Sequence, residues 1–393
     1  MSKFLGTIKD TAFLLRNLST QEEEDLNEIK ELNLLSKHYL QKLEKLMKQK
    51  KAKIRWSSLG LTFFTDEENK VPIIEGDDIP EMNDKINSGI WLQKFHLFAG
   101  KVWEVLPKLI APEIVGMDDT KKAATLQLFS TERIHILLLG DPGTGKTDIL
   151  RSAHDFASVS SFGLGSGTSG VGLSVTVVGK EVHPGLLPMA NKGLCCIDEL
   201  NLMKKDDRAS LYNAMEKGFV TYDKGSHHYQ FDALVKVLAT ANPKGDEFTG
   251  DSVDDFKKSM PFDPALLSRF HVVFLVRKPR IDEFVKIAEK IIEHQSTTNT
   301  DVDKKDVEFI KNYIKIAEKI NVEFDQKFTD EIKIFAGDIR IHEDELLISV
   351  TPRIVVGIMR LALASARMEL RKKVEQSDIT RAIEVFESSL KIY

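Results

Sequence analysis

One eight-residue stretch, Gly140-Asp141-Pro142-Gly143-Thr144-Gly145-Lys146-Thr147, constrains the fold more than any other part of the chain. It fits the phosphate-loop pattern G-x-x-x-x-G-K-[ST] at every required position. The apolar run 134–139 precedes it and a helix-compatible run, 148–157, follows, which is the strand–loop–helix context that such a loop requires. A chance glycine-rich turn would not come with these flanks. The stretch therefore predicts a P-loop that binds a nucleoside triphosphate, ATP with Mg²⁺.

Each part of this loop has an expected role. The glycines let backbone N–H groups turn toward a polyphosphate, and the helix that follows adds the positive end of its dipole. Lys146 is expected to reach the β- and γ-phosphates, and Thr147 is expected to hold Mg²⁺. All eight residues are predicted to contribute to nucleotide binding.

Acidic and amide side chains follow two other apolar runs. The run 193–197 ends in Asp198 and Glu199, and the run 238–241 ends in Asn242. Ligands of open α/β sheets bind beyond the carboxyl ends of the strands, so these side chains are expected beside the P-loop. Asp198 would bind Mg²⁺ directly or through water, Glu199 would polarise the attacking water, and Asn242 would orient that water. Either run alone would be an ordinary strand end or turn; the P-loop is what makes them candidates.

Two arginines complete the predicted ATP site. Arg269 stands just before the apolar run 272–276, and Arg353 follows a Thr-Pro pair near the start of a helical pattern. Either arginine alone is typical of a surface ion pair. In a P-loop ATPase, Arg269 has the place of an arginine finger, which reaches the γ-phosphate held by a neighbouring subunit. Arg353 is a candidate second clamp that senses nucleotide from the helical side.

Composition limits the remaining functional classes. The net charge of −5 is small for 393 residues, so any DNA surface must be a local basic patch. Cys195 and Cys196 are adjacent in an apolar run, where neighbouring side chains point to opposite faces of a strand. They predict buried thiols in a reducing compartment rather than a disulfide or zinc framework. Without a secretory signal or a long apolar run, the chain is expected to be cytoplasmic, or nucleoid-associated in an archaeon, with no membrane partner.

Three regions differ in pattern. Residues 1–105 predict a small, mainly helical domain, 106–278 an α/β ATPase core, and 279–393 an all-helical lid. The β-rich runs of the core alternate with helical patterns, at 134–139, 193–197, 235–240 and 272–276. Such alternation predicts a mainly parallel sheet flanked by helices.

The amino-terminal region carries an apolar repeat. A capping box at Ser19 opens a pattern of apolar residues at three- and four-residue steps to about Lys53, which predicts a long helix. Its stripe would pack on a neighbouring helix or form a dimerising coiled coil. The basic run from Lys48 to Arg55 precedes a tryptophan and suits either a solvated helix end or a contact with single-stranded nucleic acid. Two short strands are expected at 59–64 and 71–74, followed by an acidic connector at 77–87.

Several motifs occur in a fixed order along most of the chain. They are Ala111-Pro112-Glu113-Ile114-Val115-Gly116, Leu126-Gln127-Leu128-Phe129, the P-loop, Cys196-Ile197-Asp198-Glu199-Leu200, Ala241-Asn242-Pro243, Leu266-Leu267-Ser268-Arg269-Phe270 and Thr351-Pro352-Arg353. From about residue 107 onward, the chain resembles the AAA+ motor of the minichromosome maintenance (MCM) family, the hexameric replicative helicases of archaea and eukaryotes. The resemblance implies an AAA+ core with β-hairpin inserts and a helical lid.

The resemblance also implies two hairpins that contact DNA. Residues 169–178 are similar to the helix-2 insert of these motors, which projects into the central channel, and Thr176 and Lys180 are its expected DNA contacts. Residues 219–238 form two β-rich runs around Lys224-Gly225-Ser226, similar to the pre-sensor-1 hairpin, whose tip lysine contacts DNA phosphates. Lys224 is the matching residue. An ordinary surface hairpin is the alternative.

The chain departs from the family pattern in several places. Its P-loop ends in Gly145-Lys146-Thr147, the general AAA+ form, where these helicases usually have Ala-Lys-Ser. The segment between Val178 and Gly193 is short, which predicts a reduced hairpin, and Lys217-Gly218 replaces the usual glutamine pair. The family's amino-terminal barrel and zinc module are not expected within residues 1–105. Ring assembly and DNA loading are therefore not carried over from the family.

The resulting hypothesis is an ATP-dependent DNA helicase. It would form a homo-hexamer or a related ring on single-stranded or forked DNA, without sequence specificity and with other replication proteins as further partners. Each subunit would hold its own nucleotide, while Arg269 and Arg353 would act on the neighbour's. Two alternatives stay open: a protein-remodelling AAA+ ATPase of the chelatase or MoxR type, and an accessory subunit that completes another ring. The Lys224→Ala variant distinguishes a DNA motor from a protein-remodelling ATPase, because only a DNA motor would lose DNA stimulation of its ATPase activity.

Overall fold

The computed structural model describes residues 53–57, 60–64, 95, 98–178, 181–224, 227–250, 252–281, 284–285, 287–289, 304–346 and 350–390. By internal contacts, the chain divides into two units. The first comprises Met1–Val105 and Ile292–Tyr313, and the second comprises Leu106–Ile291 and Ile314–Tyr393. The predicted domain boundaries at 105 and 278 stay predictions.

In the first unit, the described elements include a two-stranded antiparallel sheet. Strand β1 (Lys53–Ser57) pairs with β2 (Gly60–Phe64), with Arg55 opposite Thr62. The expectation that Arg55 belongs to a helix end is therefore wrong. Polar and apolar residues alternate in Lys-Ile-Arg-Trp-Ser, which is the period of a strand. The rest of the predicted helix from Ser19, the strand at 71–74 and the connector at 77–87 lie outside the described residues.

The second unit is built on a parallel sheet of five strands. They are β3 (His135–Gly140), β4 (Ser160–Leu164), β7 (Leu194–Asp198), β10 (Lys236–Ala241) and β11 (Val272–Val276). Their spatial order is β11-β3-β10-β7-β4, and every neighbouring pair is parallel. The four predicted strands are confirmed to within one residue at each end. The fifth, β4, was not predicted, because Ser-Ser-Phe-Gly-Leu is an edge strand without a clear apolar period.

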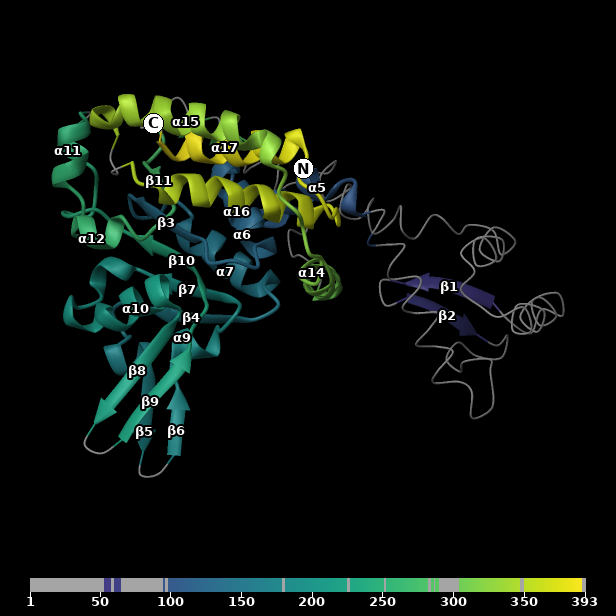
Figure 1. Ribbon diagram of the computed structural model, residues 1–393, viewed down its shortest axis with the longest axis horizontal. Helices are drawn as coiled ribbons and strands as arrows, with labels where there is room; N and C mark the ends of the chain where they lie inside the picture. The colour runs from purple at the N-terminus through teal and green to yellow at the C-terminus, as the bar shows by residue number, and fades with distance from the viewer. Residues whose placement is uncertain are drawn as a thin grey trace. The chain divides into compact units, whose positions relative to one another are not determined.

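Helices cover both faces of this sheet (Figure 1). On one face, α7 (Lys146–Phe156) packs against β4, β7 and β10, and α6 (Asp118–Phe129) packs against β3 and α7. On the other face, alternate residues of the strands form an apolar core with several helices. These are α10 (Ala209–Lys217), α11 (Val253–Lys258), α12 (Pro264–Leu267) and the short helices α8 (Gly170–Leu173) and α9 (Leu186–Met189). The loop before α11 also contributes to this core.

The two cysteines lie on opposite faces of this sheet. Cys195 belongs to the core on the α10 side, whereas the Cys196 thiol lies 3.7 Å from the Leu150 carbonyl oxygen on α7. Both thiols are free and buried, as predicted. Burial raises the pKa of Cys195 to about 11 and the pKa of Cys196 well above its ordinary value, so neither is a thiolate near neutral pH.

Helical elements follow the sheet, as predicted for a lid. They include α14 (Lys304–Ala317), α15 (Thr329–Ile341), α16 (Arg353–Met368) and α17 (Gln376–Leu390). Helix α16 packs along α6 and α17. Among the described helices, none combines the length and the apolar character that a bilayer crossing needs.

Two charged side chains, Arg367 from the lid helix α16 and Lys236 from strand β10, hold the carboxyl end of α6. Arg367 donates to the Phe129 carbonyl oxygen at 3.1 Å, and the buried Lys236 donates to those of Leu128 and Ser130 at 3.0 and 2.8 Å. The last carbonyl groups of a helix lack partners within the helix and carry the negative end of its dipole. Two buried cations supply both the hydrogen bonds and the opposite charge.

Two β-hairpins project from the same end of this unit (Figure 1). The first pairs β5 (Val175–Val178) with β6 (Glu181–Pro184), and the second pairs β8 (Phe219–Lys224) with β9 (His227–Asp232). Both hairpins were predicted. The strands of the first have only four residues each, in keeping with the short segment seen in the sequence.

Candidate nucleotide-binding site

The P-loop connects the carboxyl end of β3 to the first turn of α7. Gly143 and Gly145 have φ angles of 75° and 84°, in the left-handed region where a side chain is strained. A Cβ atom on Gly145 would also lie 2.8 Å from the Ile114 side chain. This loop path therefore requires glycine at both positions, and it leaves the amino terminus of α7 open toward the loop.

Lys146 is buried inside the loop. Its Nζ donates hydrogen bonds to the carbonyl oxygens of Gly140 and Asp141, at 2.9 and 2.5 Å, and lies 3.2 Å from the Thr144 hydroxyl. Burial lowers the pKa of Lys146 to about 8, against the opposing effects of the Asp141 and Asp198 carboxylates. Backbone carbonyl groups of the P-loop thus hold the ammonium group inside the loop.

Asp198 is the centre of a hydroxyl–carboxylate cluster. Thr147 Oγ1 lies 3.0 and 3.1 Å from its two carboxylate oxygens, and Thr240 Oγ1 lies 2.5 Å from Oδ1. The neighbouring Glu199 donates its backbone N–H to Thr240 Oγ1 at 2.9 Å. The cluster forms because β3, β10 and β7 are adjacent, and all three end at the same edge of the sheet. A carboxylate beside a hydroxyl offers the hard oxygen ligands that suit Mg²⁺.

The remaining predicted water-orienting residues lie at the same edge. Asn242 directly follows β10, and its backbone N–H donates to Asn201 Oδ1 at 3.0 Å. Glu199 has a φ angle of 52°, which is uncommon for a residue other than glycine. Such backbone conformations concentrate at functional sites, where the surrounding contacts hold them.

Asp141 has a structural task within the loop. Its carboxylate accepts hydrogen bonds from the backbone N–H groups of Phe248 and Lys278, at 2.8 and 2.9 Å, and its own N–H donates to the Val276 carbonyl oxygen. These contacts tie the start of the P-loop to the end of β11 and to the loop after β10. The Asp141 side chain therefore holds the P-loop against these two segments.

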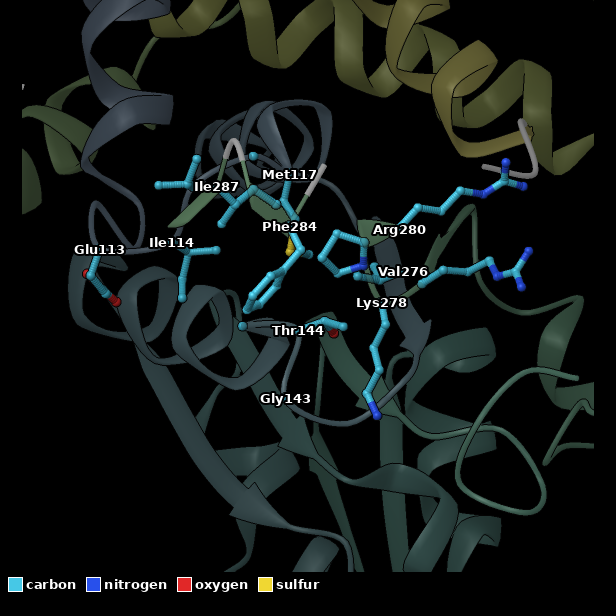
Figure 2. A pocket seen from close by; sticks show the side chains of 15 residues that line it. Glu113, Ile114, Met117, Gly143, Thr144, Val276, Lys278, Arg280, Phe284 and Ile287 are labelled. Atoms are coloured by element: carbon cyan, nitrogen blue, oxygen red, sulfur yellow. The ribbon is translucent and has the colours of Figure 1, made fainter. Parts of the chain in front are cut away.

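A cavity of about 790 Å³ adjoins the P-loop. Figure 2 shows Ile114, Met117, Phe284 and Ile287 on its apolar side, above Thr144. The basic residues Arg277, Lys278 and Arg280 line another part, and the Arg280 side chain extends away from the apolar group. The volume falls in the range of small-molecule sites, and the apolar side suits a flat, weakly polar group such as a nucleobase.

Arg269 and Arg353 lie near the amino ends of the strands, whereas the P-loop lies at their carboxyl ends. Arg269 comes just before β11, which runs parallel to β3, so it stands at the amino ends of the strands. Five residues of strand span about 16 Å. Arg353 donates to the Ser268 carbonyl oxygen at 2.5 Å, which places it beside Arg269. Neither arginine therefore stands with the phosphate-binding residues of its own chain.

Local contacts orient the Arg269 side chain. Its guanidinium forms an ion pair with Glu216 at 2.8 Å, donates to the Ala265 carbonyl oxygen at 2.6 Å, and lies over the Tyr212 ring at 4.8 Å. Its Nε is buried without a hydrogen-bond partner. The Arg269 side chain is thus partly held by contacts within its own chain.

The predicted DNA contacts lie on the two hairpins. Lys224 is the last residue of β8 and stands in register opposite His227, next to the turn of its hairpin. Thr176 lies in β5, opposite His183. Lys180 lies outside the described residues. Lys224 and Thr176 are thus carried by separate hairpins.

A parallel sheet in the chain order 5-1-4-3-2, a P-loop after its first strand in the chain (β3), an acidic residue at the end of β7 and a helical lid define an AAA+ type P-loop NTPase. Comparison with known families agrees. The family model for the MCM P-loop domain matches residues 92–295, and that for the MCM AAA-lid domain matches residues 308–390. The chain belongs to the MCM family.

Curated relatives share the same region. The chain is 32% identical to DNA replication licensing factor mcm4 of Schizosaccharomyces pombe over 324 residues, which cover 74% of this chain and 35% of the relative. It is 28% identical to mcm7-A of Xenopus laevis over 310 residues, covering 73% and 43%. The match to mcm5-A of Xenopus laevis is 27% over 334 residues, covering 76% and 45%. The chain thus matches less than half the length of these relatives.

Sequence reasoning missed several residues that shape the site. From the sequence, Thr240 was treated only as part of a strand end. It is a single hydroxyl residue in an otherwise apolar run, and that pattern could have indicated a role for its side chain. Asn201 and the cavity residues Phe284 and Ile287 gave no local signal, because their contacts depend on how distant segments pack.

Proposed function

We propose that this protein is an MCM-type ATPase that couples ATP hydrolysis at subunit interfaces to movement along DNA, in DNA replication. The observation that carries the proposal is the split arrangement of its charged groups. Lys146, Thr147 and Asp198 lie together at the carboxyl ends of the strands, whereas Arg269 lies at their amino ends. One subunit would supply the phosphate-binding half of each site and its neighbour the arginines.

The chain's own residues divide the chemical work. The P-loop amides and Lys146 bind the β- and γ-phosphates, and Thr147 with Asp198 would hold Mg²⁺. When bound, Mg²⁺ neutralises charge that develops on the phosphates during transfer. Glu199 accepts a proton from the attacking water, and Asn242 orients that water. A neighbour's Arg269 then stabilises the charge of the transition state, an effect worth roughly 10³- to 10⁵-fold in rate where measured.

The ring would place the hairpins of several subunits around one DNA strand. Lys224 lies beside the turn of its hairpin, where a flexible ammonium suits contact with phosphates of any sequence. The relatives named above are replication licensing factors, which favours DNA over a protein substrate and does not favour the remodelling alternative. Such a role places the protein with the chromosome, in the nucleus or the nucleoid.

The composition of the ring is a separate matter. The family matches include differently numbered licensing factors, and they give no support to a homo-hexamer over a ring shared with other family members. Light scattering with ATP and DNA, on the chain alone and mixed with a full-length family member, distinguishes the two. Particles that form only in the mixture identify a subunit of a shared ring.

The decisive experiment measures ATPase activity with and without single-stranded DNA across a salt series. We expect DNA to stimulate hydrolysis, and the stimulation to fall steeply with salt as phosphate contacts are screened. Lys224→Ala should remove most of the stimulation while basal hydrolysis persists. Lys217→Ala, at the end of α10, is the matched control and should behave as wild type. Hydrolysis that ignores DNA, or stimulation that survives Lys224→Ala, would contradict the proposed coupling.

A further inference from the structure

Lys121 on α6 is a buried cation whose partners are backbone carbonyl groups. Its Nζ donates to the carbonyl oxygens of Ala111 and Ile114, at 2.9 and 2.6 Å, and the residue is only 5% exposed. Burial lowers the pKa of Lys121, against the opposing effects of Asp118 and Glu113. Among the described residues, no carboxylate forms an ion pair with it. A buried charge is costly unless it is hydrogen-bonded, and two carbonyl groups of the segment 111–117 supply hydrogen bonds to this one.

That loop, residues 111–117, follows a strained path. Ala111 and Met117 have φ angles of 45° and 58°, in the left-handed region that side chains disfavour, and Gly116 has a φ angle of 83°. The Ala111 N–H donates to Ser152 Oγ on α7 at 3.1 Å, and the Ala111 carbonyl oxygen also accepts from the Ile114 N–H. Lys121 and Ser152 together hold the loop between α6 and the helix of the P-loop.

The same loop forms one wall of the cavity beside the P-loop. Residues 113–117 line the cavity, and Figure 2 shows Ile114 and Met117 on its apolar side. Ile114 also packs against Gly145, where even a Cβ atom would come within 2.8 Å of it. The wall that Lys121 holds therefore lies beside the P-loop, which has its own anchoring contacts through Asp141.

We propose that Lys121 is a positioning residue for the nucleoside half of the substrate: it holds the wall that contacts the base and ribose, and the P-loop binds the phosphates independently of it. The inference rests on the nucleotide site of the proposed function. A lysine suits this task because its three N–H donors can reach two carbonyl groups at once, while α6 fixes its stem.

The test separates the two halves of the ligand. The dissociation constants of ATP and of inorganic tripolyphosphate, each with Mg²⁺, are measured by calorimetry on wild type and on Lys121→Met. We expect ATP binding to weaken by about tenfold or more and tripolyphosphate binding to stay within about twofold. In steady-state kinetics, KM for ATP rises while kcat at saturation is unchanged, because the lost interaction is equal in the ground and transition states.

Three further variants make the result specific. Lys122→Met removes the adjacent lysine, which is half-buried and pairs with Asp119 instead of the loop carbonyl groups, and should behave as wild type. Lys121→Arg keeps donors for both carbonyl groups and should restore most of the ATP affinity. Ile114→Ala shortens the wall without disturbing the buried charge, so it tests the proposal even where Lys121→Met fails to fold. It should reproduce the selective loss of ATP binding.

The outcomes are distinct. Equal weakening of ATP and tripolyphosphate, or unchanged ATP affinity in Lys121→Met and Ile114→Ala, overturns the role of Lys121 in nucleoside binding. A wild-type protein that binds neither ligand overturns the nucleotide site itself, and with it the proposed function. Selective loss of ATP in Lys121→Met and Ile114→Ala, with rescue by Lys121→Arg, supports the positioning role.

Discussion

Arg353, the first residue of α16, donates a hydrogen bond to the carbonyl oxygen of Ser268 at 2.5 Å, and Ser268 directly precedes Arg269. The same helix carries Arg360 and Arg367 at seven-residue intervals, which places all three on one face two turns apart. Each donates to a backbone carbonyl group of the core. The lid and the turn that bears the candidate arginine finger are therefore joined, and a shift of one would carry the other.

A shared ATP site predicts complementation between two inactive variants. Lys146→Ala should abolish ATP binding at a subunit's own site, and Arg269→Ala should abolish hydrolysis at its neighbour's, with losses of at least about 10³-fold. Mixed, the two should recover hydrolysis, because some interfaces pair an intact P-loop with an intact Arg269. ATPase assays on a titration of one variant into the other measure this. Mixtures that stay inactive at every ratio would rule out a site shared between subunits.

Glu199→Gln should trap ATP. The amide keeps the size of the carboxylate but cannot accept a proton from water, so turnover should fall by about 10²-fold or more while ATP still binds. Filter binding of radiolabelled ATP together with single-turnover hydrolysis gives both quantities. Glu384→Gln, which alters an exposed carboxylate on α17, is the control and should hydrolyse ATP as wild type does. Normal turnover in Glu199→Gln would exclude its role as the base.

Thr240 supports Asp198 through the hydrogen bond at 2.5 Å, so Thr240→Val should misalign the Mg²⁺ ligands. Loss of such a supporting hydrogen bond typically costs about 10- to 100-fold in metal affinity or activity. We expect the Mg²⁺ concentration for half-maximal ATPase to rise by about tenfold. Thr380→Val on the exposed side of α17 is the control. An unchanged Mg²⁺ requirement would mean that the contact is dispensable.

The pKa of Lys146, lowered to about 8, predicts that ATP affinity depends on pH. The phosphates stay ionised above pH 7, because their second pKa is about 6, whereas Lys146 loses its charge as pH rises through 8. Binding then requires proton uptake, and ATP affinity should weaken by roughly tenfold between pH 7.5 and 9. Calorimetric titrations across this range test it. Lys146→Arg keeps its charge and should show a much flatter profile.

The buried His271 predicts loss of stability in acid. Burial lowers its pKa to about 3, and the guanidinium groups of Arg360, Arg353 and Arg133 act in the same direction. Because the pKa in the unfolded chain is about 6.5, the unfolded state binds more protons between these values, so the free energy of unfolding falls as pH falls below 6.5.

The expected size of this loss is about 1.4 kcal/mol between pH 7.5 and 5.5 for this one histidine. Urea unfolding at the two pH values measures it. His271→Gln should remove that part of the pH dependence, whereas His183→Gln, at an exposed position, should not. The same pH dependence in wild type and His271→Gln would show that another group is responsible. His135, which contacts His271, is also held neutral by burial and adds to the remaining slope.

Much of the fold was predictable because it depends on local patterns. The runs that became β3, β7, β10 and β11 are continuous apolar segments bounded by turns, and a strand buried on both faces requires such a segment. The strand β4 escaped notice because its residues carry little of that signal. In the first unit, the pairing of β1 with β2 was not predicted. The helical pattern was assigned as far as about Lys53, with its end in the basic residues up to Arg55, although polar and apolar residues alternate there with the period of a strand.

The site divides in the same way. The sequence by itself determined the P-loop, the acidic pair at Asp198 and Glu199 and the identity of Arg269, because their chemistry requires particular residue types at short spacings. Only the tertiary structure decided that Arg269 stands across the sheet from Lys146, that Thr240 supports Asp198, and that the Lys121 charge holds the cavity wall. Those relations join residues far apart along the chain or on separate elements, and they exist only once strand order and helix packing bring the elements together.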